Sequence, residues 1–208
     1  MKTLLLFLVY TLLTAITANA QDAETNSPDV IVKQVVDKVI SSLKSDKDLI
    51  HSHQKLEEFV ETKLLYLFDF AYMARQTIGE KRWESASTQE QSDLVDEYRA
   101  FMANIFTNAL SQYEDQSVIF PPFTMSTDTT IAIVKSKLID PTDETEGFNF
   151  KLDRTSDGWK IYDVELGGID LIRTYKSNFS STLQHGGIQK LIGDLHRKNV
   201  EVKMAKSG

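Results

Sequence analysis

The 208-residue chain contains no cysteine, and basic residues are fewer than acidic ones. The lack of cysteine excludes disulfides, thiol nucleophiles and thiolate metal sites together, so stability must come from packing. A hydrophobic content of 41%, with 10% aromatic residues, is sufficient for a buried core. No internal repeat or low-complexity tract indicates a second unit, and we therefore expect one globular domain.

The shortage of basic residues also limits the kinds of partner. There are 23 lysines and arginines against 30 acidic residues, which gives a net charge of −7. This balance argues against nucleic acid as a partner and against broad electrostatic attraction to anionic lipid head groups. Any contact with lipid would therefore be apolar and made in a pocket.

The amino terminus has the features of a secretory signal peptide. Lys2 precedes the apolar run "LLLFLVYTLLTAI", and the small residues Ala18 and Ala20 flank Asn19. The run is shorter than the roughly 20 apolar residues of a membrane-spanning helix, and polar residues follow it. We expect residues 1–20 to be removed after Ala20, and residues 21–208 to form the exported domain.

Helical patterns dominate the first half of the exported chain. Ser27 and Pro28 suit a helix start, and Ser87 with Glu90 has the spacing of a capping box. Trp83 is expected in a connecting segment. The apolar periodicity predicts helices over residues 28–44, 53–68, 69–79 and 88–114.

After residue 116 the composition changes to β-branched and aromatic residues separated by turns. Four antiparallel strands are predicted within residues 117–125, 129–139, 148–154 and 159–166. Two further helices follow, separated by Gly186 and Gly187. Helices, a strand meander and then helices indicate an α+β fold, with a four-stranded antiparallel sheet wrapped by N- and C-terminal helices.

Residues with catalytic or metal-binding chemistry are sparse. His51 and His53 form a His-x-His pair without a well-spaced third ligand, so no metal site is predicted. Tyr162 and Asp163 would suit an acid–base pair in an apolar cavity, which leaves a small isomerase-like enzyme as an alternative function. Neighbours on one strand point to opposite faces, however, so only one of the two can enter the cavity. No catalytic residue is assigned.

Several segments carry a resemblance to a known family. The stretch "DFAYMARQTIGEKRWESASTQEQ", the amphipathic helix after it, and "GWKIYDVELGGIDLIRTYKSNF" with "GGIQKLI" further on resemble the MlaC family, also called toluene-tolerance or ABC-transporter auxiliary proteins. The resemblance covers nearly all of the mature chain, and its blocks have the right spacing.

This resemblance implies a phospholipid carrier of the periplasm rather than an enzyme. Its expected partners are an outer-membrane lipoprotein complex and an inner-membrane ABC transporter with a substrate-binding ring, between which it would move lipids and so maintain outer-membrane lipid asymmetry. The implied fold has a deep apolar pocket for acyl chains. Phospholipid would be the cargo, and no cofactor is implied.

We place the mouth of this pocket at the joint between the fourth strand and the next helix. Gly167 and Gly168 would allow a sharp turn, so that Ile169 and Ile172 lie beside the cavity. An ordinary strand-to-helix connection with core-packed isoleucines is the alternative. The remaining pocket wall is predicted on the long helix and the sheet, at Phe101, Ile105, Ala109, Ile131, Ile133, Phe148 and Phe150.

Overall fold

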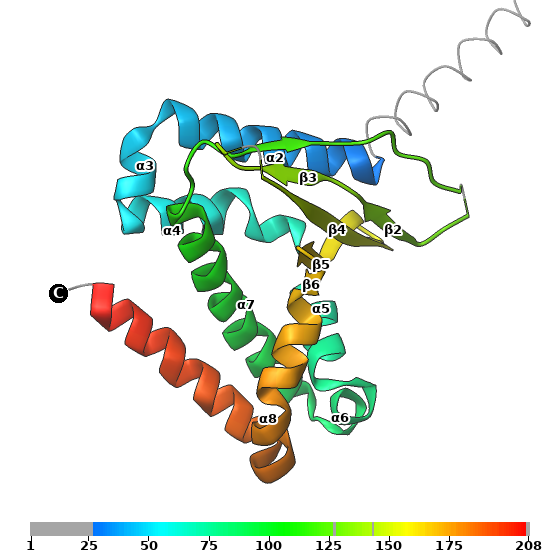
Figure 1. Cartoon of the computed structure of the whole chain (residues 1–208). Helices are drawn as coiled ribbons and strands as arrows, with labels where there is room; N and C mark the ends of the chain where they lie inside the picture. The colour runs from blue at the N-terminus through cyan, green and yellow to red at the C-terminus, as the bar shows by residue number, and fades with distance from the viewer. Residues whose placement is uncertain (1–26, 127, 143, 207–208) are drawn as a thin grey trace, which may run out of the picture.

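The structure is a computed structural model that describes residues 27–206 except 127 and 143, so the expected signal peptide lies outside the described residues. Helices come first along the chain (Figure 1). They are α2 (Pro28–Ser45), α3 (Lys47–His51), α4 (His53–Lys63), the 3-10 helix η1 (Leu65–Leu67), α5 (Phe70–Ile78), α6 (Glu80–Ser85) and α7 (Thr88–Ser111). Among the described residues, no helix is long and apolar enough to cross a membrane.

Local signals determine several helix ends as expected. The capping box of α7 is complete, because the backbone N–H of Glu90 donates to Ser87 Oγ at 3.2 Å and that of Ser87 donates to Glu90 Oε2 at 2.9 Å. Gly79, with a φ of 87°, both ends α5 and precedes α6. Trp83 therefore lies in a helix, and the prediction of a connecting segment there is wrong.

The predicted helix over residues 53–68 ends early because the chain joins the sheet. Phe68 forms a parallel bridge with Ile161, and the backbone N–H of Asp69 donates to Ile161 O at 2.9 Å. Asp69 then accepts the N–H of Tyr72 at 2.8 Å, which caps α5. The segment after α4 thus lies against the strand that contains Ile161.

The α+β class is confirmed, but the sheet has six strands within the described residues instead of four. The longest strand, β4 (Thr145–Thr155), pairs on one side with β5 (Gly158–Leu166) and on the other with β2 (Ile131–Val134) and β3 (Lys137–Ile139). One predicted strand splits into two at Ser136, whose backbone N–H donates to the side chain of Asn149 at 3.3 Å. The strands are β1 (Ser117–Ile119), β2 (Ile131–Val134), β3 (Lys137–Ile139), β4 (Thr145–Thr155), β5 (Gly158–Leu166) and β6 (Ile169–Asp170).

The last helix, α8 (Leu171–Lys206), is broken at Gly187, which has non-helical angles of φ 67° and ψ −165°. This is the break that the glycine pair predicted. We call residues 171–186 the first arm and residues 188–206 the second arm. The second arm turns back so that both arms lie beside the lower part of α7 (Figure 1).

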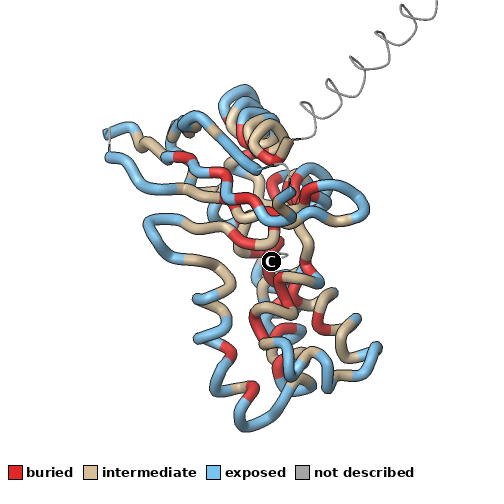
Figure 2. The backbone as a smooth tube through the Cα atoms, turned by 90° about the vertical axis from the view of Figure 1, so that its right-hand side faces the viewer, coloured by how far each residue is buried: buried red, intermediate tan, exposed pale blue. Residues whose placement is uncertain are grey.

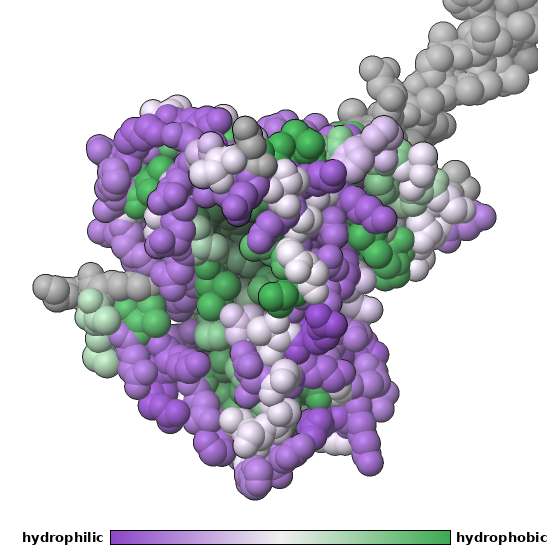
Figure 3. All heavy atoms as spheres, viewed as in Figure 1, coloured by the Kyte–Doolittle hydropathy of each residue, from purple (hydrophilic) through white to green (hydrophobic). Residues whose placement is uncertain are grey.

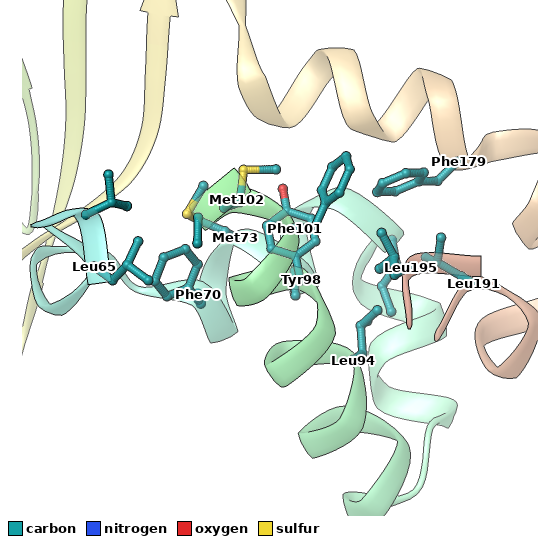
Figure 4. Packing of buried hydrophobic residues seen from close by; sticks show 14 of the residues in the cluster. Leu65, Phe70, Met73, Leu94, Tyr98, Phe101, Met102, Phe179, Leu191 and Leu195 are labelled. Atoms are coloured by element: carbon teal, nitrogen blue, oxygen red, sulfur yellow. The ribbon is translucent and has the colours of Figure 1, made fainter. Parts of the chain in front are cut away.

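Buried apolar residues form three clusters, which lie where the sheet meets α2 and where the helices meet one another (Figure 2). The helical cluster is the largest and joins α4, α5, α7 and both arms of α8. Tyr98 lies within it, with its hydroxyl 3.1 Å from Thr77 Oγ1 (Figure 4). The sheet cluster joins α2 to β2, β4 and β5, and a smaller cluster joins α2, α3 and α4.

Candidate functional site

The sheet has an inner face that contributes to the core and an outer face that carries polar groups. Phe150 and Leu152 of β4 belong to the sheet cluster and lie opposite Val164 and Ile161 of β5. Residues directly opposite on antiparallel strands share a face. Val32 of α2 packs into the same cluster, so α2 covers part of the inner face.

A bulge in β5 changes which residues face inward. Lys151 pairs with Asp163 while Leu152 pairs with Ile161, so Tyr162 is the extra residue. The Tyr162 ring packs edge-on against Tyr72, with centroids 5.0 Å apart, and contacts the helical cluster. Asp163 lies on the face of Lys151. Because of the bulge, Tyr162 and Asp163, which would form the possible acid–base pair, lie in different surroundings.

Asp163 of β5 links the end of the sheet to the start of α8 through hydrogen bonds. It is only 3% exposed, and its Oδ1 accepts the backbone N–H of Val164 at 3.0 Å and that of Ile172 at 3.2 Å. Its Oδ2 accepts from Lys151 Nζ at 3.0 Å, and the same ammonium group also donates to Asp170. Burial opposes the charge of Lys151, but the hydrogen bonds to Asp170 and Asp163 outweigh it and raise the pKa of Lys151. Both Asp163 oxygens are thus engaged.

The space between the clusters is lined by apolar side chains that are only partly buried. Val35 and Phe68 contact both the helical and the sheet cluster, and Val39, Phe59 and Leu110 contact the helical cluster and the small one. We call the space that these five residues border the central hollow. In the space-filling view, apolar atoms line a hollow where α4 lies behind the space between α7 and the strands (Figure 3). A domain of this size ordinarily has one contiguous core, so a partly exposed apolar boundary between clusters indicates room for a ligand.

An exposed apolar row lies at the end of the inner face. Phe148 is opposite Leu166, and Leu166 is opposite Ile169, so one row crosses β4, β5 and β6. Phe148 packs on the sheet cluster, whereas Leu166 is 42% exposed and Ile169 is 63% exposed. We call these three residues the apolar rim. The rim is adjacent to Gly167 and Gly168, where we expected the mouth.

The structure separates the predicted wall residues of the sheet into two groups. Phe148 and Phe150 lie on the inner face, with ring centroids 4.6 Å apart. Ile131 and Ile133, in contrast, lie opposite Asp153 and Lys151 on the outer face and are 41% and 49% exposed. Their assignment to the same wall is therefore corrected. The alternate residues of β2, Ala132 and Val134, face the core instead.

The predicted residues on α7, β6 and α8 are also dispersed. Phe101 is buried and its ring meets Tyr175 of the first arm, so it points to α8 and not to the sheet (Figure 4). Ala109 is exposed, and Ile105 is partly buried against the helical cluster. Ile172 is partly buried and Ile169 belongs to the rim. Lipid contact by any of these residues stays a prediction.

Several apolar residues near the central hollow were not predicted as pocket wall from the sequence, and they have a regular spacing. Phe106 packs on Phe68 with ring centroids 4.8 Å apart, and Leu110 follows one helical turn later. Val35 and Val39 of α2 have the same four-residue spacing. Each pair forms one helical face. On α7 this face is one residue out of phase with the predicted residues Ile105 and Ala109.

Comparison with known proteins finds similarity to proteins described as MlaC or as phospholipid-binding. A family model described as MlaC protein matches residues 33–197. The chain is similar to the intermembrane phospholipid transport system binding protein MlaC of Haemophilus influenzae, with 22% identity over 198 residues covering 91% of this chain and 88% of the relative. It also resembles the solved structure of a phospholipid-binding protein from Ralstonia solanacearum in complex with a phospholipid, with a TM-score of 0.75 and 26% identity, covering 84% of this chain and 98% of that one.

The fold and the hollow define a small α+β protein whose apolar interior reaches the surface. Because the family model matches most of the chain, the protein belongs to the MlaC family.

Proposed function

We propose that this protein binds one phospholipid with its acyl chains in the central hollow and carries it through the periplasm. The observation that carries the proposal is the partly exposed apolar boundary formed by Val35, Val39, Phe59, Phe68 and Leu110. The relative from Ralstonia solanacearum, which holds a phospholipid in a similar fold, supports it.

The physical need for a carrier follows from the acyl chains. At about 0.8 kcal/mol per buried methylene, about thirty methylenes in two chains correspond to roughly 25 kcal/mol of apolar transfer. A lipid therefore crosses an aqueous compartment only if its tails are covered. The head group can stay in water at the apolar rim, so the net charge of −7 is no obstacle to binding.

The proposal also includes where the protein acts and which complexes it exchanges lipid with. The leader features of residues 1–20 support export and cleavage after Ala20. The name of the Haemophilus influenzae relative refers to an intermembrane transport system. In our proposal the carrier exchanges lipid with an outer-membrane lipoprotein complex and with an inner-membrane ABC transporter that has a substrate-binding ring, and so maintains the lipid asymmetry of the outer membrane.

The test is to purify the full-length product from a periplasmic extract without detergent. Intact mass should lack residues 1–20, and organic extraction followed by lipid mass spectrometry should yield up to one phospholipid per chain. Removing the lipid should lower the melting temperature, because a ligand that binds only the native state stabilises it. Extracts free of phospholipid, with an unchanged melting temperature after solvent stripping, would overturn the proposal.

A further inference from the structure

A second apolar cavity lies away from the central hollow, between α7 and the two arms of α8. Its volume is about 190 Å³. The floor consists of Phe101 from α7, Tyr175 and Phe179 from the first arm, and Leu191 and Leu195 from the second arm. Figure 4 shows Phe101 pointing toward Phe179 and away from Leu65 near the sheet. We call this cavity the α8 groove.

The three aromatic rings of the α8 groove form a continuous surface. Phe101 meets Tyr175 edge-on with centroids 5.1 Å apart, and Tyr175 stacks on Phe179 at 5.6 Å. Such rings favour a further ring in an offset or edge-on position. A cavity of about 150 Å³ lined by apolar side chains holds one benzene molecule, so the α8 groove has room for a small aromatic body.

Polar side chains around the floor of the α8 groove can form hydrogen bonds with a ligand. The hydroxyls of Tyr175 and Thr182 and the amide of Asn178 line the groove, and none of them has a hydrogen-bond partner among the described residues. Burial raises the pKa of Tyr175, and a tyrosine hydroxyl is in any case protonated at neutral pH and available as a donor. An apolar floor with a few convergent polar groups is typical of a small-molecule site.

The charges at the groove favour an anion with one negative charge. Asp194 is already paired with Lys190 at 2.8 Å and with Arg197 at 2.9 Å. Lys198 Nζ lies 5.7 Å from the centroid of Phe101, and within the described part of the chain no carboxylate pairs with it. Asp194, the acidic residue of the groove, is thus already neutralised by Lys190 and Arg197. Lys198 is therefore the cation of the groove that can pair with the negative charge of a ligand.

We propose that the α8 groove is a second binding site, which takes a small aromatic monocarboxylate with its ring against Phe101, Tyr175 and Phe179 and its carboxylate at Lys198. This site is separate from the phospholipid site, so the proposal does not depend on the proposed function. Because both arms of α8 and α7 contribute to the floor, a bound ring would also join the second arm to the rest of the helical cluster.

The experiment is calorimetric titration of the phospholipid-loaded protein with 2-naphthoate. Two further compounds separate ring from charge, since 2-naphthylmethanol has the ring without the charge and octanoate has the charge without the ring. We expect 2-naphthoate to bind more tightly than either. Lys198→Gln should weaken its binding about fivefold, as for a partly exposed ion pair, and Phe179→Leu should weaken it about threefold through the lost ring contact. Lys135→Gln, at an exposed position between β2 and β3, is the control and should leave binding unchanged.

Equal binding by 2-naphthoate and the control compounds, or unchanged binding in both Lys198→Gln and Phe179→Leu, would overturn the proposal. Binding to the lipid-stripped protein alone, with displacement by phospholipid, would also overturn it, because the ligand would then be in the central hollow. If the protein carries no phospholipid but binds 2-naphthoate through Lys198, the second site stands and the proposed function fails.

Discussion

Asp163 on β5 accepts the backbone N–H of Ile172, and this 3.2 Å hydrogen bond ties the end of the sheet to the first turn of α8. Lys151 completes the joint from β4 by pairing with both Asp163 and Asp170. The apolar rim lies on the inner face at this same joint, so the ion cluster on the outer face keeps the two ends of the rim, Phe148 and Ile169, in register.

We expect Lys151→Met to lower the free energy of unfolding by about 3 kcal/mol, because it leaves a buried carboxylate without its cation. The joint substitution Lys151→Met with Asp163→Asn should recover part of this loss, since asparagine keeps an acceptor for Ile172 without the charge. Urea denaturation measures both. Lys135→Met, at an exposed position, is the control and should change stability by less than about 0.5 kcal/mol. An equally small effect of Lys151→Met would contradict the structural role of the cluster.

Burial of Tyr98 raises its pKa, an effect that the hydrogen bond with Thr77 only partly opposes. An unfolded tyrosine ionises near pH 10, while the folded one stays protonated. The unfolded state therefore binds fewer protons above about pH 10, and stability falls as pH rises from there toward the raised folded pKa.

Tyr98→Phe should remove this component of the alkaline loss. At pH 7 the variant should be less stable by about 1 kcal/mol, because Thr77 loses a buried partner. Unfolding free energies between pH 7 and 11 should then converge, since only the wild type carries the Tyr98 contribution. Lys151 titrates equally in both proteins, so it does not affect the difference. Parallel curves over the whole range would show that Tyr98 is not protected from ionisation.

Gly187 and Gly193 provide a matched pair in the second half of α8. Gly187 has a φ of 67° and a ψ of −165°, a conformation that residues with a Cβ rarely adopt, whereas Gly193 is helical and has open space around its Cα. We expect Gly187→Ala to destabilise the fold by about 1–3 kcal/mol and Gly193→Ala to stabilise it by up to about 1 kcal/mol. Thermal unfolding tests the opposite signs. Stabilisation by both would mean that α8 does not need the break at Gly187.

Features encoded by neighbouring residues could be predicted from the sequence. The start of α2 at Pro28, the capping box at Ser87 and the break at Gly187 depend on local backbone chemistry, and all three are present. The positions of β4 and β5 also follow from their alternating side chains and turns.

Which face an element turns to its neighbours could not be predicted. Ile131 and Ile133 are larger than Ala132, yet Ala132 faces the core because α2 packs against that side of β2. Helix α7 contacts other helices on more than one side, so apolar residues occur on more than one of its faces. The apolar period of α7 therefore does not identify which face borders the central hollow. Phe101 was therefore assigned to the pocket wall together with Ile105 and Ala109, although its ring packs against Tyr175 of α8.

The apolar rim predicts a defect in lipid transfer without a defect in folding. Ile169→Gln should change the free energy of unfolding by less than about 0.5 kcal/mol, because the side chain is 63% exposed. Uptake of fluorescent phospholipid from vesicles should nevertheless slow, since acyl chains would pass a polar group at the proposed mouth. Ile131→Gln is the matched control, an isoleucine 41% exposed on the outer face. Equal uptake rates for the two variants would remove the rim from the transfer route.

Two neighbouring residues of α7 allow the central hollow to be tested directly. Leu110 borders the hollow and is partly buried, whereas Ala109 next to it is exposed. In Leu110→Trp the indole should occupy space that an acyl chain needs, so bound phospholipid per chain should fall well below that of the wild type. In Ala109→Trp the indole should extend into solvent and leave lipid occupancy unchanged.

The stability of the lipid-stripped proteins distinguishes a hollow from a packed core. Overpacking a close-packed interior costs about 1–3 kcal/mol through strain, because such interiors have few voids. In an open hollow Leu110→Trp should cost little, so its stripped form should melt close to the stripped wild type. A large destabilisation with normal lipid loading would show that Leu110 is part of the core. Loss of lipid in Ala109→Trp alone would instead favour the helix face first predicted from the sequence, with Ala109 toward the lipid.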